Sequence, residues 1–177
     1  MTSKKVRFDL DRRQFMAGVG TAALVISGSA VLHTGEAWGL EVNNLKPETM
    51  RTLIKMARDI YPHDRLSDRY YAIAVKGYDE KASKDADVKS MIETGVAALD
   101  ARAREKHGAE YASVPWEAER VALLRDVQKD KLFATLRGDL IVSLYNQKEI
   151  WPVFGYEGES AAKGGYIDRG FNDILWL

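Results

Sequence analysis

The amino-acid sequence predicts an all-α protein: an irregular bundle of about five helices, followed by an irregular tail rich in glycine and aromatic residues. Apolar residues recur at three- and four-residue spacing over most of the region 47–144, as on the buried faces of amphipathic helices. No stretch alternates apolar and polar residues convincingly with the period of two typical of a half-buried strand. Proline, glycine and capping residues bound these periodic stretches, where helices start and stop.

The first predicted helix begins at Pro47 and ends at Tyr61. Proline suits the first helical position because its missing N–H has no partner there in any residue. Pro62 ends the helix, since the residue before a proline is pushed out of the helical region of backbone space. Residues 38–46 are expected to be a short linker.

The second predicted helix is capped by Ser67 or Asp68 and runs to about Tyr78. A polar break is expected after it. The acidic residues there lack the glycine and the final glutamate of a calcium-binding loop, so they are interpreted as a solvated connection that caps the next helix. These residues are Asp79, Glu80, Asp85 and Asp87.

Three further helix boundaries follow from the same signals. A long helix is expected from Asp85 to His107, because Gly108 follows as a helix C-cap. Pro115 opens the next helix, and another begins at about Lys129.

The start of the chain has the layout of an export signal. Arg12 and Arg13 precede an apolar run from Phe15 to Leu32 that contains no charged residue, and the triplet Gly35-Glu36-Ala37 has small residues at its two ends. A positive segment, an apolar segment and a small-x-small exit together indicate a cleaved signal peptide. The paired arginines resemble the twin-arginine signal, which directs folded proteins across the membrane.

Two other interpretations of this segment stay open. A retained transmembrane helix needs about 20 strongly apolar residues, and the run from 15 to 32 is diluted by glycine and hydroxyl side chains. An ordinary secretory signal would tolerate the two arginines by chance. In either case the segment would direct the chain to or through a membrane.

Charge and cysteine content exclude several functions. The formal net charge is zero, and five basic and three acidic residues precede position 38, which leaves a net charge of −2 on the rest. No basic field is therefore present to bind nucleic acid. The chain has no cysteine, which excludes disulfides, covalent c-type haem, cysteine-bound iron–sulfur clusters and thiol catalysis.

The last part of the chain, residues 151–177, has too much glycine for a helix and too much apolar mass for disorder. Two interpretations are equally open: the tail wraps its own bundle, or it docks on another subunit. Aromatic side chains are enriched both in cores and at interface hot spots. The candidate partner-binding residues are Trp151, Phe154, Tyr156, Tyr166, Arg169, Phe171 and Trp176.

Few residues point to catalysis. The string from Gly18 to Ala23 matches a dinucleotide fingerprint, but no strand precedes it and it lies in the export signal. His63-Asp64 is a possible acid–base pair, although such a histidine is more often a solvated loop residue. His107 suits the end of a helix, where a cation is favoured. We therefore expect no catalytic, cofactor-binding or metal-binding residue on this chain.

Several motifs resemble the small-subunit family of gluconate 2-dehydrogenase-type enzymes, the subunit 3 family. They are the twin-arginine start, the helix end Ile60-Tyr61-Pro62, and the tail with Trp151, Gly155-Tyr156-Glu157-Gly158 and Arg169-Gly170-Phe171. The resemblance implies an accessory subunit without a redox centre. It accompanies a large dehydrogenase of the glucose–methanol–choline type, supplies the export signal and supports folding of its partner.

The resemblance also implies the partners and the location. FAD is expected on the large subunit, a cytochrome c subunit often completes such complexes, and the export signal, carried by Arg12, Arg13 and Phe15, engages the twin-arginine machinery. The complex is then periplasmic. The expected organisation is an export signal in 1–37, a helical domain in 38–150 and the tail in 151–177. The alternatives are a stand-alone periplasmic enzyme and a membrane-anchored structural protein.

Overall fold

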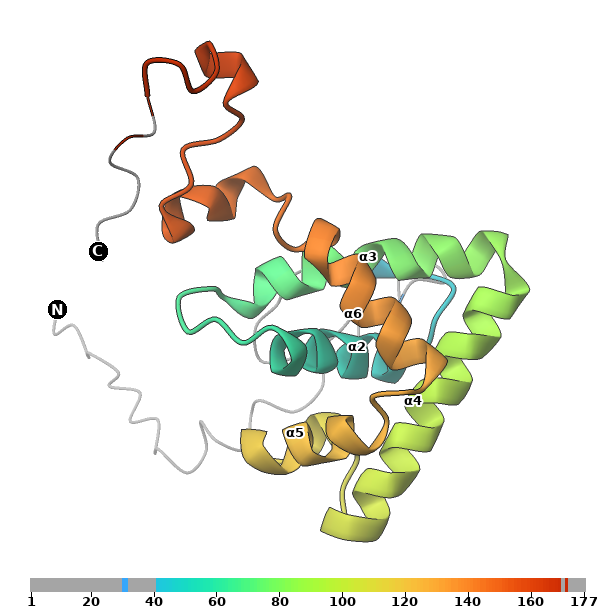
Figure 1. Cartoon of the computed structure of the whole chain (residues 1–177). Helices are drawn as coiled ribbons and strands as arrows, with labels where there is room; N and C mark the ends of the chain where they lie inside the picture. Colours follow the sequence, from blue (N-terminus) through green and yellow to red (C-terminus); the bar gives the residue numbers. More distant parts are fainter. Residues whose placement is uncertain (1–29, 32–40, 170, 172–177) are drawn as a thin grey trace, which may run out of the picture.

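The computed structural model describes residues 30–31, 41–169 and 171, and its architecture is all-α, as predicted (Figure 1). The α-helices of the described residues are α2 (Pro47–Ile60), α3 (Asp68–Lys84), α4 (Ala86–His107), α5 (Glu117–Asp126) and α6 (Lys131–Ser143). Three short 3-10 helices connect and follow them: η1 (Tyr111–Ser113), η2 (Lys148–Phe154) and η3 (Ala161–Lys163). The prediction of an irregular helical bundle is confirmed.

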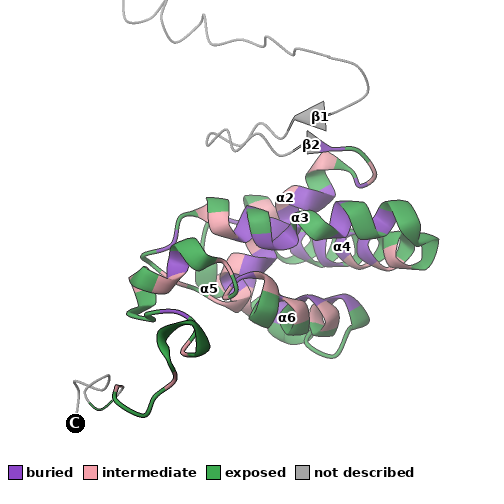
Figure 2. Cartoon of the chain, turned by 90° about the horizontal axis from the view of Figure 1, so that it is seen from above, coloured by how far each residue is buried: buried purple, intermediate pink, exposed green. Residues whose placement is uncertain are grey.

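Helix α2 lies at the centre of the bundle. It packs against α3, α4, α5, α6 and η1, and most of its side chains are buried. Figure 2 shows the buried residues gathered where α2, α3 and α4 face one another, while the outer face of α4 is exposed. Met50, Leu53, Met56 and Ala57 of α2 are almost completely buried and form the middle of the core.

The capping signals of α4 were predicted correctly. The Asp85 side chain accepts hydrogen bonds from the backbone N–H groups of Asp87 and Val88, at 2.8 and 3.2 Å. At the other end Gly108 has a φ of 71° and donates its N–H to the Arg104 carbonyl oxygen at 2.9 Å. Glycine adopts this left-handed backbone conformation at little energetic cost, so Gly108 can end the helix after His107.

The predicted polar break after Tyr78 is wrong. Helix α3 continues to Lys84, and Asp79 is a buried residue within it rather than part of a solvated connection. Its two carboxylate oxygens accept hydrogen bonds from the backbone N–H groups of Asn43, Asn44 and Leu45, at 3.2, 2.9 and 2.9 Å. Charge alone could not reveal this, because the partners lie about 35 residues away in the chain.

The segment before α2 is therefore docked rather than a free linker. Val42 and Leu45 are buried, and Asp79 holds the backbone between them. Glu93 of α4 extends this anchor, since its carboxylate accepts from the backbone N–H of Lys46 at 3.0 Å and from the Thr49 hydroxyl at 2.7 Å. The prediction of a linker over 38–46 fails from Val42 onward.

One other helix boundary and one strand pairing differ from the sequence prediction. Helix α5 begins at Glu117 instead of Pro115, because the carbonyl oxygens of Val114 and Pro115 accept hydrogen bonds from the Arg120 side chain and the backbone there stays extended. Trp116, which directly precedes this helix, is 70% exposed. A two-residue antiparallel pairing that was not predicted joins β1 (Ala30–Val31) to β2 (Glu41–Val42).

Replacing Asp79 by alanine is expected to release the docked segment. Three backbone N–H groups lose their acceptor, and leaving buried donors unpaired typically costs about 1–3 kcal/mol of unfolding free energy. Urea titration should show this loss, with faster proteolytic cleavage near residues 41–46. Glu80→Ala is the matched control, because Glu80 pairs with Lys84 on the exposed side of the same helix and should change neither reading.

The same carboxylate should make stability depend on pH. Burial of Asp79 acts to raise its pKa, but the hydrogen bonds from Leu45, Asn44 and Asn43 outweigh burial and hold the pKa below its ordinary value. A group with a lowered folded pKa stabilises the fold above its unfolded pKa, and this contribution is lost as the pH falls through the folded value. Asp79→Asn should therefore flatten the acid side of the stability profile. Unchanged curves for both Asp79 variants would contradict the anchoring role.

Candidate partner-binding surface

The segment η2 (Lys148–Phe154), where the tail begins, completes the core of the bundle. Ile150 is fully buried, and Val153 packs against the core from the same 3-10 helix, η2. The Trp151 indole N–H donates to the carbonyl oxygen of Tyr145 at 2.8 Å. Residues 148–154 are thus the root of the tail, and here the tail wraps its own bundle.

The remainder of the tail leads away from the helices (Figure 1). Figure 2 colours nearly all of its described residues as exposed. Tyr166 is 52% exposed, Ile167 84% and Phe171 83%. These three residues contribute little to the core, so this part of the tail does not serve to finish the bundle.

An apolar groove lies where the tail leaves the bundle. Exposed Ile141 and Val142 on α6 form one side of it, and Phe154 and Tyr156 of the tail line it too. Its volume is about 630 Å³. Ile141 is 57% exposed, so this part of α6 faces away from the core of the bundle.

His63 joins the tail to the loop after α2. Its Nε2 lies 2.7 Å from the Tyr145 hydroxyl oxygen, and its ring meets those of Tyr145 and Phe154 edge-on, with centroids 5.6 and 4.9 Å away. Burial lowers the pKa of His63, and the positive charge of Arg58 lowers it further against the opposing effect of Asp64. A neutral histidine packed among aromatic rings fits a structural contact.

The other predicted tail residues are placed as follows. Trp151 is half-buried and meets the Tyr156 ring edge-on at 5.1 Å. Arg169 donates to Glu157 at 2.6 Å and lies over the Tyr166 ring, so its charge is used within the tail. The remaining predicted residues, Arg12, Arg13, Phe15 and Trp176, lie outside the described residues.

Sequence reasoning missed Val142, Tyr145 and Glu157. Leu140-Ile141-Val142 is a run of three apolar residues, which is more than one buried helix face accommodates, and it could have indicated an exposed apolar patch. Tyr145 and Glu157 had no such signal, because their roles depend on contacts with the loop at His63 and with Arg169.

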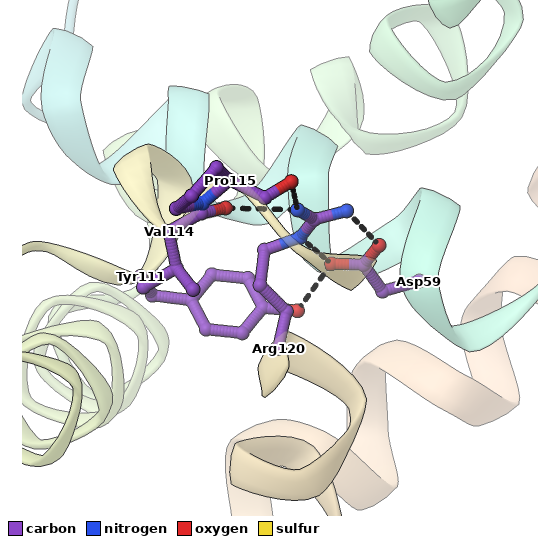
Figure 3. Close-up of polar contacts among 5 residues, drawn as sticks. All are labelled: Asp59, Tyr111, Val114, Pro115 and Arg120. Carbon is purple, nitrogen blue, oxygen red and sulfur yellow. Dashed lines mark hydrogen bonds and ion pairs between the residues drawn. The ribbon is translucent and has the colours of Figure 1, made fainter. Parts of the chain in front are cut away.

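A second chemically notable cluster lies inside the bundle, around Asp59 of α2 (Figure 3). The Arg120 side chain donates to both Asp59 carboxylate oxygens, at 2.7 and 2.9 Å, and the Tyr111 hydroxyl donates to one of them at 2.6 Å. Arg120 also donates to the carbonyl oxygens of Val114 and Pro115. All three side chains are buried and bonded to one another, so this cluster joins α2, η1 and α5 rather than offering a group to a ligand.

Comparisons with models of protein families, with curated proteins and with solved structures found no match for this chain. Within the described residues, no group of three or more acidic, histidine or cysteine side chains is placed to hold a metal ion. In that same part of the chain, none of the helices is long and apolar enough to span a membrane. The candidate surface on the tail and α6 is therefore the feature on which a function is best argued.

Proposed function

We propose that this chain is a non-catalytic small subunit that escorts a FAD-dependent dehydrogenase of the glucose–methanol–choline type to the periplasm and stays bound to it. The observation that carries the proposal is the apolar tail surface beyond residue 154, which is exposed instead of packed on its own bundle. Large exposed apolar patches on a soluble chain mark contact surfaces. The groove beside α6 extends this surface onto the bundle.

The sequence supplies the rest of the support. Arg12 and Arg13 resemble a twin-arginine signal, and that route carries proteins already folded. A large subunit that has bound FAD in the cytoplasm would need such a route and could use the signal of its companion. In this proposal FAD belongs to the large subunit, and a cytochrome c subunit accepts its electrons.

Two phenylalanine substitutions test the contact. Phe171→Ala removes a side chain that is 83% exposed, so the melting temperature should stay unchanged. Binding to the co-expressed large flavoprotein should weaken by about 2 kcal/mol, or roughly thirtyfold, as for an interface aromatic. Phe154→Ala should lower the melting temperature as well, because the rings of His63 and Tyr145 lose a neighbour.

The measurement is co-purification of the flavoprotein, followed through its flavin absorbance, together with thermal unfolding of the free chain. Ile73→Ala is the matched control, since Ile73 is an exposed apolar residue on α3 outside the tail. Failure of the wild-type chain to bind any flavoprotein encoded beside it would contradict the proposed function. Loss of binding in the Ile73 control to the same extent would show that the tail is not the contact.

A further inference from the structure

In the exposed part of the tail, one carboxylate, that of Glu157, bonds to two basic side chains further along the chain. Oε2 of Glu157 accepts a hydrogen bond from the Arg169 guanidinium at 2.6 Å and another from the Lys163 ammonium group at 3.2 Å. These cations lie 12 and 6 residues further along the chain. Glu157 therefore ties the end of a loop, residues 157–169, back to its beginning.

The backbone of this loop supports the same closure. Gly158 has a φ of 100°, and a Cβ at this position would lie 3.5 Å from the Trp151 ring, so the start of the loop lies beside the root of the tail. Gly164 and Gly165 both have a φ of 82°, and the Gly165 N–H donates to the Ser160 carbonyl oxygen at 2.8 Å. Left-handed turns at glycine let the chain reverse without strain.

This closure contributes little to the stability of the bundle. The Glu157 side chain is 61% exposed, and exposed ion pairs add little free energy to folding because water and salt screen them. Holding a loop in its bound conformation acts instead on binding, because fewer conformations are lost when the partner docks. The two ion pairs are thus better explained by recognition than by folding.

The loop also limits what the partner can be. Tyr166 and Ile167 are exposed apolar side chains of the loop, and exposed Phe171 follows two residues after it, while the two cations of the loop are paired with Glu157. Attachment to an anionic membrane or to nucleic acid needs free basic residues beside the apolar ones, and this loop keeps its basic residues in internal pairs. The surface it fits is an apolar recess on a protein.

We infer that Glu157 is a positioning residue, which holds the loop 157–169 in a preformed shape so that Tyr166, Ile167 and Phe171 enter an apolar recess on the large subunit. This inference rests on the proposed function, because it takes the flavoprotein as the partner. The new element is the role of Glu157, which sets the shape of the contacting loop without itself having to touch the partner.

Charge-neutralising variants test this role. Glu157→Gln should weaken binding to the co-expressed flavoprotein about tenfold, since an open loop must be ordered on docking. Chymotrypsin should cut the free chain faster after Tyr166, while the melting temperature stays unchanged. Asp168→Asn is the matched control, because it removes one negative charge from the same loop at an exposed residue. The double variant Glu157→Arg with Arg169→Glu should restore both binding and protection by reversing the pair.

The outcomes separate the two proposals. A wild-type chain that fails to bind the flavoprotein contradicts the proposed function, whereas protease protection of the free loop still reports on Glu157. A wild-type chain that binds, with equal affinity for Glu157→Gln, overturns the positioning role alone. An equal loss of binding affinity in Asp168→Asn overturns the positioning role as well, since the affinity would then depend only on the net charge of the loop. Binding of the wild-type chain to phosphatidylcholine vesicles, lost in Phe171→Ala, would assign the loop to a membrane surface instead.

Discussion

Replacing Arg120 by methionine is expected to lower the free energy of unfolding by about 3–5 kcal/mol, the usual cost of removing one partner from a buried ion pair. Asp59 would keep its buried negative charge with the Tyr111 hydroxyl as its remaining partner. The carbonyl oxygens of Val114 and Pro115 would lose their donor too. For a domain of this size, the melting temperature should fall by roughly 10–15 °C.

Two comparisons make this test specific to the buried pair. Lys106→Met breaks an ion pair with Asp126 whose two side chains are largely exposed, and it should change the melting temperature little. Adding Asp59→Leu to Arg120→Met should recover part of the loss, since the unpaired charge is removed as well. If Arg120→Met and Lys106→Met lowered the melting temperature equally, burial of the ion pair would not determine how much stability its loss costs.

If the proposed escort role holds, changing both Arg12 and Arg13 to lysine is expected to leave the chain, and the dehydrogenase activity proposed to travel with it, in the cytoplasm. The twin-arginine receptor reads the arginine pair itself, so lysine keeps the charge but loses the recognised groups. Cell fractionation with an activity assay on both fractions measures the effect. Lys4→Arg with Lys5→Arg is the control, because it changes two basic side chains outside the pair and should not alter export.

The result also decides the escort role. A large subunit that reaches the periplasm while this chain stays in the cytoplasm would show that it carries its own signal. A mature chain whose mass still includes residues 1–37 would favour a retained anchor over a cleaved signal.

Much of the helical architecture could be predicted because its determinants are local. Pro47, the Asp85 cap and Gly108 each act on the backbone within a turn of their own position, so their effects can be read from neighbouring residues. The extended backbone before α5 could not be predicted this way. It depends on Arg120 holding two carbonyl oxygens, and Arg120 is itself fixed by an aspartate 61 residues earlier.

The exposure of part of the tail could be anticipated from the sequence, while its partner-binding role stays a prediction. Composition alone identified the tail as unsuited to a helix, but it could not tell which aromatic residues complete the core. Which aromatic residues of the tail are buried and which are exposed depends on where the chain leaves the bundle, at η2. It also depends on the contacts of Phe154 with His63 and Tyr145. Arg169 donates a hydrogen bond to Glu157 within the tail, and its predicted contact with a partner stays a prediction.

The docked segment at Val42–Lys46 has a practical consequence for anyone who trims this protein. A recombinant fragment that starts at Pro47 would retain every described α-helix. It would nevertheless lose the backbone N–H groups that donate to Asp79 and the Lys46 N–H that donates to Glu93. It would also expose the apolar surface that Val42 and Leu45 cover. Such a fragment should give poor yields and tend to precipitate, whereas one that begins before Ala30 keeps both the docked segment and the pairing of β1 with β2. The boundary of the described domain is thus set by the docked segment at Val42–Lys46, not by the start of α2.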